Sequence, residues 1–236
     1  MISRVWNIIQ LPLVVLMVVV VFAFAKARHK QTKINEVSIT FTASNGLFIT
    51  ENTVNKLLIQ KSDTLASSRV EILDLKEMES RVLQNAMVEN AIVYKTLNGN
   101  IGAVVQQRTP IARLLDQQKY MDREHFLMPL SPVYTARVPL VTGYSEENAA
   151  EVFDFLTYVG EDEFLKRWIT GIRMSGRDAT LLVRDGTYEV KYGRLDKYES
   201  KFMRLDAFLK HAKTESKLEQ YKQIDLRYAG QVIGIK

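Results

Sequence analysis

The strongest constraint on this chain of 236 residues lies near its start, where Val5–Ala25 contains no charged side chain. At 1.5 Å of rise per residue, a helix of about 21 residues matches the thickness of a bilayer core. We therefore predict a single transmembrane helix over residues 5–25, after a short tail of residues 1–4 and before a juxtamembrane linker of residues 26–33. Four positions mark the predicted span: Val5, Leu11, Val18 and Ala25.

A cleaved signal peptide is the alternative for this segment. The cleanest apolar run, Leu11–Ala25, has the length of a signal-peptide core, and Ala23 and Ala25 form an A-x-A pattern. The run is rich in valine and follows a single basic residue, Arg4, which favours an uncleaved anchor. More basic residues follow the span than precede it, so the positive-inside rule alone places the larger part of the chain in the cytoplasm. Long translocated domains are less bound by that rule.

The composition narrows the function classes. The chain contains no cysteine, which excludes disulfides, thiolate metal sites and a cysteine nucleophile. A hydrophobic fraction of 47% with 25% charged residues is typical of a folded protein. The net charge of +5 is spread along the chain without a basic run, so we expect no nucleic-acid partner.

Residues 34–109 are predicted to form a first domain in the order β-α-α-β-β. Residues 34–42 alternate apolar and polar side chains, which predicts a strand. Its apolar face comprises Val37, Ile39 and Phe41. Thr50 can then cap a helix whose apolar positions, at helical spacing, are Val54, Leu57 and Leu58.

The second helix of this domain begins at a capping box, in which Asp74 accepts from first-turn amides and Glu77 reaches back to the cap. Its predicted buried stripe is Leu75, Met78, Val82 and Leu83. Two strand-like runs, residues 89–97 and 100–108, follow and meet at Asn98-Gly99, a dipeptide typical of a hairpin turn.

Residues 110–236 are predicted to form a second, mixed β domain with flanking helices, which makes the fold class α+β. Ser145 can cap a helix over residues 146–159. The apolar stripe of that helix is Val152, Phe153, Leu156 and Val159. Three strands follow, the last two joined at Asp185-Gly186.

The chain closes with a helix over about residues 195–212 and a strand over residues 224–236. The helix is predicted to bury Phe202, Leu205 and Leu209 and to expose Lys197, Lys201, Arg204 and Lys210. In the strand, Ile224, Leu226 and Tyr228 are predicted to face one way and Asp225 and Arg227 the other.

Catalytic motifs are sparse. The sequence contains no nucleophile elbow, phosphate-binding loop or H-E-x-x-H zinc motif, so we predict no enzyme activity, no cofactor and no metal site. Asp122, Glu124 and His125 are clustered in MDREHF and could serve acid–base chemistry or ligate a metal. A charged β-turn is the structural explanation of the same residues, and a membrane-anchored cell-wall hydrolase is the alternative function.

The order of elements and several short segments resemble the FtsQ/DivIB family of bacterial cell-division proteins. QQRTPIARL is similar to the family's E-R-x-P-x-A junction, with Gln107 in place of the glutamate. YMDREHFLMPLS resembles an aspartate-bearing hairpin, although Glu124 stands where glycine is common. VPLVTGY resembles an L-P-x-x-x-G segment, VRDGTYEVKYGR a D-G-x-x-V-x-x-G strand pair, and IDLRY is the most specific match.

The resemblance implies a transmembrane helix in the inner membrane, a cytoplasmic tail, a periplasmic POTRA domain over residues 34–109 and a β domain over residues 110–236. It implies a scaffold at the division septum that binds FtsB and FtsL, with other division proteins contacting the POTRA domain and no small-molecule substrate. A POTRA-type assembly chaperone is a further alternative, but such proteins carry repeated POTRA units and one is recognisable here.

The resemblance also implies that the C-terminal strand and the preceding helix receive FtsB. We expect residues 228–235 to pair with a partner strand, Arg227 to contact a partner carboxylate and Tyr228 to cover the joint. Pairing of Arg227 with Asp225 and a core position for Tyr228 are the structural alternatives. The predicted partner-binding residues are Arg194, Lys201, Arg204, Arg227, Tyr228, Ala229, Gln231, Val232 and Ile233.

Overall fold

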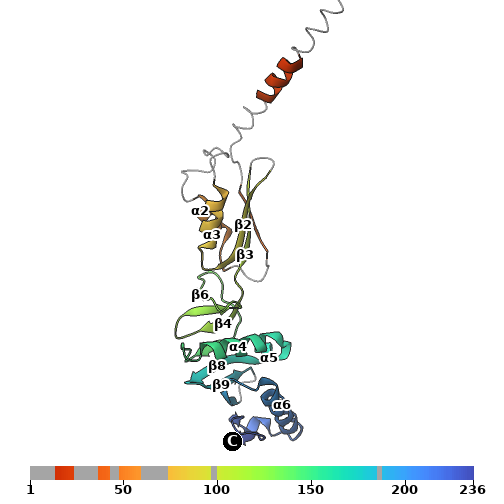
Figure 1. The fold of residues 1–236 in the computed structure, drawn as a ribbon. Helices are drawn as coiled ribbons and strands as arrows, with labels where there is room; N and C mark the ends of the chain where they lie inside the picture. Colours follow the sequence, from red (N-terminus) through yellow and green to blue (C-terminus); the bar gives the residue numbers. More distant parts are fainter. Residues whose placement is uncertain (1–13, 24–36, 43–47, 60–73, 97–99, 185–187) are drawn as a thin grey trace, which may run out of the picture. The chain divides into compact units, whose positions relative to one another are not determined.

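The fold is described from a computed structural model (Figure 1). It covers residues 14–23, 37–42, 48–59, 74–96, 100–184 and 188–236. The chain divides into two compact units, Met1–Gln107 and Arg108–Lys236. The predicted domain boundary after residue 109 lies close to this division, and each unit is described by itself.

Residues 14–23 form a helix whose side chains are exposed. No helix among the described residues is both long enough and apolar enough to cross a membrane. Val18 lies in the helix of residues 14–23, whereas Val5, Leu11 and Ala25 lie outside the described residues. The transmembrane helix therefore stays a prediction.

The first unit has the predicted order of elements. They are β1 (Val37–Phe41), α2 (Glu51–Ile59), α3 (Leu75–Leu83), β2 (Val88–Lys95) and β3 (Ile101–Gln107). β3 is the central strand, parallel to β1 and antiparallel to β2. The predicted Asn98-Gly99 turn lies outside the described residues.

The helices of this unit begin where the sequence predicts. Asp74 Oδ1 accepts the backbone amides of Lys76 at 3.0 Å and Glu77 at 3.1 Å. Met78 and Val82 are buried, as are Val54 and Leu58 of α2. Leu83 is exposed, contrary to prediction, because each residue of a helix is rotated by about 100° from the one before it and Leu83 leaves the stripe of Val82.

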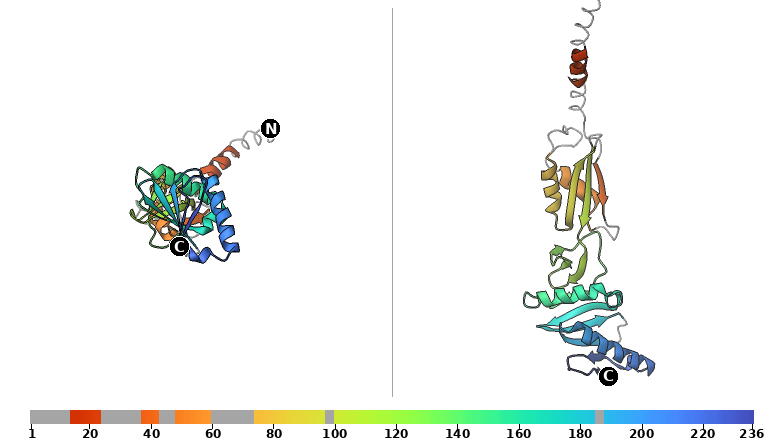
Figure 2. Two further views of the ribbon diagram at one scale, coloured as in Figure 1. Left: turned by 90° about the horizontal axis from the view of Figure 1, so that it is seen from below. Right: turned by 45° about the vertical axis from the view of Figure 1, so that its right-hand side comes forward.

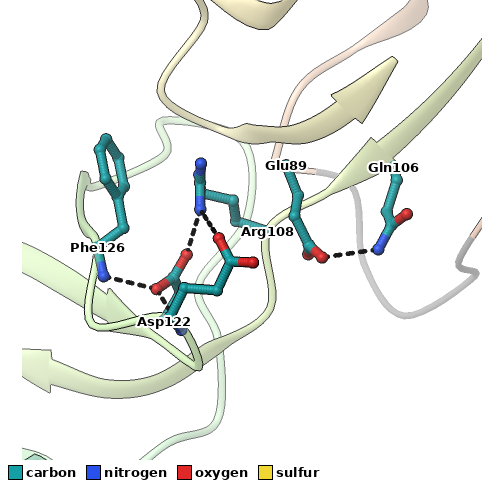
Figure 3. Close-up of polar contacts among 6 residues, drawn as sticks. Glu89, Gln106, Arg108, Asp122 and Phe126 are labelled. Atoms are coloured by element: carbon teal, nitrogen blue, oxygen red, sulfur yellow. Dashed lines mark hydrogen bonds and ion pairs between the residues drawn. The ribbon is translucent and has the colours of Figure 1, made fainter. Parts of the chain in front are cut away.

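Glutamines at the end of β3 hold neighbouring segments of the first unit. Gln106 Nε2 donates to Glu89 Oε1 across the β2–β3 pair at 2.8 Å (Figure 3). Gln107 is buried, and its Oε1 accepts the amides of Phe48 at 2.8 Å and Ile49 at 3.2 Å. An amide oxygen at residue 107 thus supplies the acceptor that the loop before α2 requires.

The second unit contains a mixed sheet of nine strands in the order β12-β11-β10-β9-β8-β7-β4-β5-β6, which confirms the α+β class. The strands are β4 (Pro110–Leu114), β5 (Lys119–Asp122), β6 (Leu127–Pro129), β7 (Leu140–Thr142), β8 (Ile169–Ser175), β9 (Asp178–Val183), β10 (Glu189–Arg194), β11 (Gln223–Asp225) and β12 (Ile233–Ile235). The helices are α4 (Ala149–Glu161), α5 (Glu163–Trp168), α6 (Tyr198–Thr214) and the short 3₁₀ helix η3 (Leu218–Gln220). The Asp185-Gly186 turn lies outside the described residues.

Strand register separates the two faces of this sheet. A row of aligned residues lies in the hydrophobic core with side chains of α4, α5 and α6, and it consists of Val141, Ile172, Leu181, Val190 and Ile224. The aligned residues of the opposite face are mostly polar: Thr142, Arg173, Thr180, Lys191 and Asp225. On β12, Gly234 continues the core row and Ile233 continues the polar row. The pleat therefore presents Ile233 away from the helices.

The start of α4 differs from the prediction. The helix begins at Ala149, so Ser145 is not its cap. The side chain of buried Asn148 binds residues outside the helix: its amide nitrogen donates to Gly143 O at 2.9 Å and to Gly176 O at 3.1 Å. Ser145 N donates to Asn148 Oδ1 at 2.9 Å. Asn148 thus ties two turns to the helix start instead of capping the helix.

Candidate partner-binding surface

The C-terminal segment is a hairpin and not the single strand that the sequence predicts over residues 224–236. β11 and β12 pair antiparallel, and residues 226–232 between them are outside any strand. Gly230 has a φ of +76°, a conformation that glycine adopts readily and that helps reverse the chain. The even alternation of the sequence does not reveal this reversal.

β12 forms the edge of the second unit's sheet. No other strand of the described residues pairs with its outer side. Ile233 is 38% exposed and Ile235 is 43% exposed. A Cβ on Gly234 would overlap the ring of Tyr221 and come within 2.9 Å of Phe208 Cζ, so this position requires glycine. The result is an apolar edge strand that lies close against Phe208 of α6 and Tyr221, at the end of the unit where Figures 1 and 2 place the C-terminus.

Arg204 of α6 contacts the turn of this hairpin. Its Nη1 donates to Tyr228 O at 2.8 Å and to Gln231 O at 3.2 Å. Arg204 is half-buried, contrary to the predicted exposed position. Tyr228 is 47% exposed, so the alternative of a core position for this side chain is wrong.

The remaining residues of the predicted set lie around the same turn. Ala229 and Gln231 are exposed. Val232 is partly buried and packs against the hydrophobic core. The structure therefore gathers these predicted residues in the turn that precedes the edge strand β12, with Val232 turned inward.

Lys201 is the clearest departure from the predicted surface. It is 7% exposed, and its Nζ donates to Arg194 O at 2.6 Å, Tyr192 O at 3.3 Å and Asp196 Oδ1 at 2.8 Å. The ammonium also lies 4.6 Å from the centre of the Tyr192 ring. A buried ammonium needs such acceptors, so Lys201 is held at the end of β10, whereas Arg194 itself is exposed.

Arg227 pairs with Asp225, which is the structural alternative that the sequence left open. Nε donates to both carboxylate oxygens at 3.0 and 3.1 Å, and Nη2 donates to Oδ2 at 2.6 Å. The hydrogen bonds from Arg227 lower the pKa of the Asp225 carboxyl below its usual range. The stem of Arg227 crosses Gly193, where a Cβ would lie 2.9 Å from Cγ. The Arg227 side chain is still 48% exposed and can make further contacts.

Sequence reasoning missed two residues of this surface, Tyr221 and Phe208. They form the wall behind Gly234, with ring centres 5.4 Å apart. Ile235 ends the segment that was predicted to pair with a partner strand, and it lies on the edge strand. Nothing local in the sequence indicates the aromatic wall, because it depends on how α6 packs on the hairpin.

The MDREHF cluster forms a braced turn between β5 and β6. Asp122 is 2% exposed, and its Oδ1 accepts the amides of Glu124 at 2.9 Å and Phe126 at 2.7 Å. Arg108 Nη1 donates to Asp122 Oδ2 at 2.7 Å and to Glu124 Oε2 at 3.0 Å (Figure 3). The guanidinium also lies 4.2 Å from the centre of the Phe126 ring. The Asp122 carboxylate is thus fully engaged in holding the turn.

The His125 side chain contacts other residues than the carboxylates of Asp122 and Glu124 do. Its Nε2 lies 3.2 Å from the hydroxyl of Tyr144, and its ring stacks on Phe153 with centroids 4.6 Å apart. Phe153 was predicted to belong to the buried stripe of α4, but it is partly exposed and Phe155 occupies the core instead. Within the described ranges, no three His, Cys, Asp or Glu side chains form a group suited to a metal ion.

Comparison with protein families assigns both units. Residues 32–106 match the model of the POTRA-like domain. Residues 109–234 match the model described as FtsQ/DivIB, C-terminal related, and this match spans more than half of the chain. A search of curated proteins returned no match. With its β-α-α-β-β unit followed by a matching C-terminal domain, the chain belongs to the FtsQ/DivIB family of bacterial cell-division proteins.

Proposed function

We propose that this protein is a membrane-anchored, non-enzymatic scaffold of the cell-division complex that receives a strand of an FtsB- or FtsL-type partner along β12. The observation that carries the proposal is the edge position of β12 with Ile233 and Ile235 exposed. An edge strand has unpaired backbone donors and acceptors, which natural proteins either protect or use to bind another strand. Backbone bonds would supply affinity, and the two isoleucines would fix the face on which the partner packs.

The side chains around the turn would add specificity. Tyr228 offers an exposed ring with a hydroxyl, the kind of side chain enriched at interface hot spots. Arg227 and Arg194 would meet acidic partner side chains, because both are exposed and basic. Ala229 and Gln231 would contact the partner through the exposed turn, whereas Val232 supports the turn from within.

The proposal also includes the chain's place in the cell. Residues 5–25 would anchor the protein in the inner membrane through contact with lipid, residues 1–4 would be cytoplasmic, and the two units would lie in the periplasm at the septum. The POTRA-like unit would contact other division proteins, and this chain would link early and late steps of septation.

Binding to the periplasmic segments of FtsB and FtsL tests the proposal. The full chain, purified in detergent, is compared with a chain that ends at Leu226 and so keeps β11 but lacks the turn and β12. We expect binding by the full chain and loss of binding by the shortened one, with circular dichroism showing that both are folded. Equal binding by both chains would place the interface elsewhere, and no binding by either would contradict the partner assignment.

A point variant refines the test. Ile233→Glu with Ile235→Glu places two charges beside the proposed joint without shortening the chain. Met203→Glu is the matched control, because Met203 is an exposed apolar residue of α6 at 69% exposure and has no place in the proposed joint. We expect the double variant to weaken binding more than tenfold and the control to bind as the unchanged chain does.

A further inference from the structure

We propose that Arg204 is a positioning residue that closes the Tyr228–Gln231 turn and thereby holds β12 in its hairpin register. The notion of Arg204 as a direct partner contact is replaced by a role inside the chain. The effect on partner affinity rests on the function proposed above, but the effect on the hairpin does not.

The hairpin has few contacts of its own to keep it closed. β11 and β12 are each three residues long and pair at three positions, and the seven residues between them lie outside any strand. A hairpin of this size is marginally stable by itself. Its closure therefore depends on contacts from elsewhere in the unit.

Arg204 supplies such a contact at the turn. One guanidinium nitrogen bonds two carbonyls, Tyr228 O at 2.8 Å and Gln231 O at 3.2 Å, which brackets the Gly230 reversal. Hydrogen bonds from a charged donor are stronger than neutral ones, and the planar guanidinium presents its donors in a fixed geometry. With Arg204 engaged in this way, the two ends of the turn are drawn to one point on α6.

One face of α6 holds three successive parts of the surface. Lys201 bonds the end of β10, Arg204 bonds the turn, and Phe208 packs behind Gly234 of β12. Spacings of three and four residues place these side chains on the same side of a helix. The helix thus acts as a clamp, in which Arg204 is the polar contact to the turn.

Hydrogen exchange measured on the full chain in detergent tests the inference. Arg204→Met removes both hydrogen bonds and keeps a long, helix-compatible side chain. We expect amides in residues 226–236 to exchange about tenfold faster, while those of β8–β10 are unchanged. Lys210→Met is the control, because this substitution also removes one positive charge from α6, while Lys210 pairs only with Asp206 of the same helix among the ion pairs of the described residues. This control should leave the exchange of residues 226–236 unchanged.

The conservative variant separates positioning from packing. Arg204→Lys restores a charged donor and should return part of the protection, which a purely steric role would not do. If Arg204→Met also speeds the exchange of β8–β10, the exchange of residues 226–236 in Arg204→Lys tests the positioning role instead. Unchanged exchange of residues 226–236 in both Arg204 variants would overturn the inference.

Affinity for the FtsB periplasmic segment is the second readout. We expect Arg204→Met to speed dissociation about tenfold in parallel with faster exchange, and Arg204→Lys to do so less. Weaker binding with unchanged exchange would instead identify Arg204 as a direct contact and overturn the positioning role. If the unchanged chain does not bind FtsB, the proposed function fails, whereas the exchange result still decides the role of Arg204.

Discussion

At the scale of single residues, the Asp225–Arg227 pair predicts a pH dependence of stability. Arg227 lowers the folded-state pKa of Asp225, so the pair stabilises the folded chain fully above the ordinary carboxyl pKa of about 3.9 and loses this effect as the pH falls through the lower folded value. We expect Asp225→Asn to lower the thermal unfolding midpoint at pH 7 and to make the decline of the midpoint below about pH 4 shallower. Asp206→Asn, which alters an exposed pair on α6, should change neither.

Asp122 gives a second prediction at this scale and separates a structural turn from a catalytic site. Asp122→Ala would leave two turn amides without their acceptor and Arg108 without its buried carboxylate, so we expect a loss of about 3 kcal/mol in the free energy of unfolding. Glu124→Ala should cost less than about 1 kcal/mol, because the Glu124 side chain is 63% exposed. Urea denaturation measures both values. A hydrolase would instead keep its stability in the Asp122 variant and lose activity.

At the scale of elements, Gly234 tests how closely β12 is packed. A Cβ at this position would overlap Tyr221 and Phe208, so Gly234→Ala should destabilise the chain by about 1–3 kcal/mol. Gly160→Ala is the control of opposite sign, because nothing lies within 4 Å of the added atom and alanine favours the α4 helix by about 0.5–1 kcal/mol. Equal effects of the two substitutions in urea denaturation would contradict the close packing of the edge strand.

The same elements show what the sequence can predict. Asp74 and the stripe of Met78 and Val82 were predictable because caps and helical spacing are local patterns. The terminal hairpin was not, because the reversal at Gly230 depends on contacts with α6 that are distant in sequence. The prediction that Lys201 is exposed was wrong for the same reason. A lysine on a charged helix face is normally solvated, and only the carbonyls at the end of β10 make the burial of Lys201 favourable.

At the scale of the whole molecule, the two units have different proposed functions: the second unit binds the partner strand, and the POTRA-like unit contacts other division proteins. The edge strand and the clamp of α6 lie entirely within Arg108–Lys236. Family membership was predictable from sequence because the order β-α-α-β-β and segments such as IDLRY are contiguous in the chain. The sequence predicted a strand at the end of the chain, but not the hairpin that places β12 at the sheet edge, since this edge is defined by the tertiary pairing of β11 with β10 and β12.

The orientation of the chain in the membrane is the last prediction, because charge and family lead to opposite answers. The basic residues after residue 25 favour a cytoplasmic body, whereas membership in the FtsQ/DivIB family favours a periplasmic one. We expect alkaline phosphatase fused after Lys236 to be active and green fluorescent protein fused there to be dark, since the first folds in the periplasm and the second in the cytoplasm. The fusions should also keep the mass of the uncleaved chain. Fluorescence without phosphatase activity would show that the charge distribution decides the topology, and it would remove β12 from the compartment of its proposed partner.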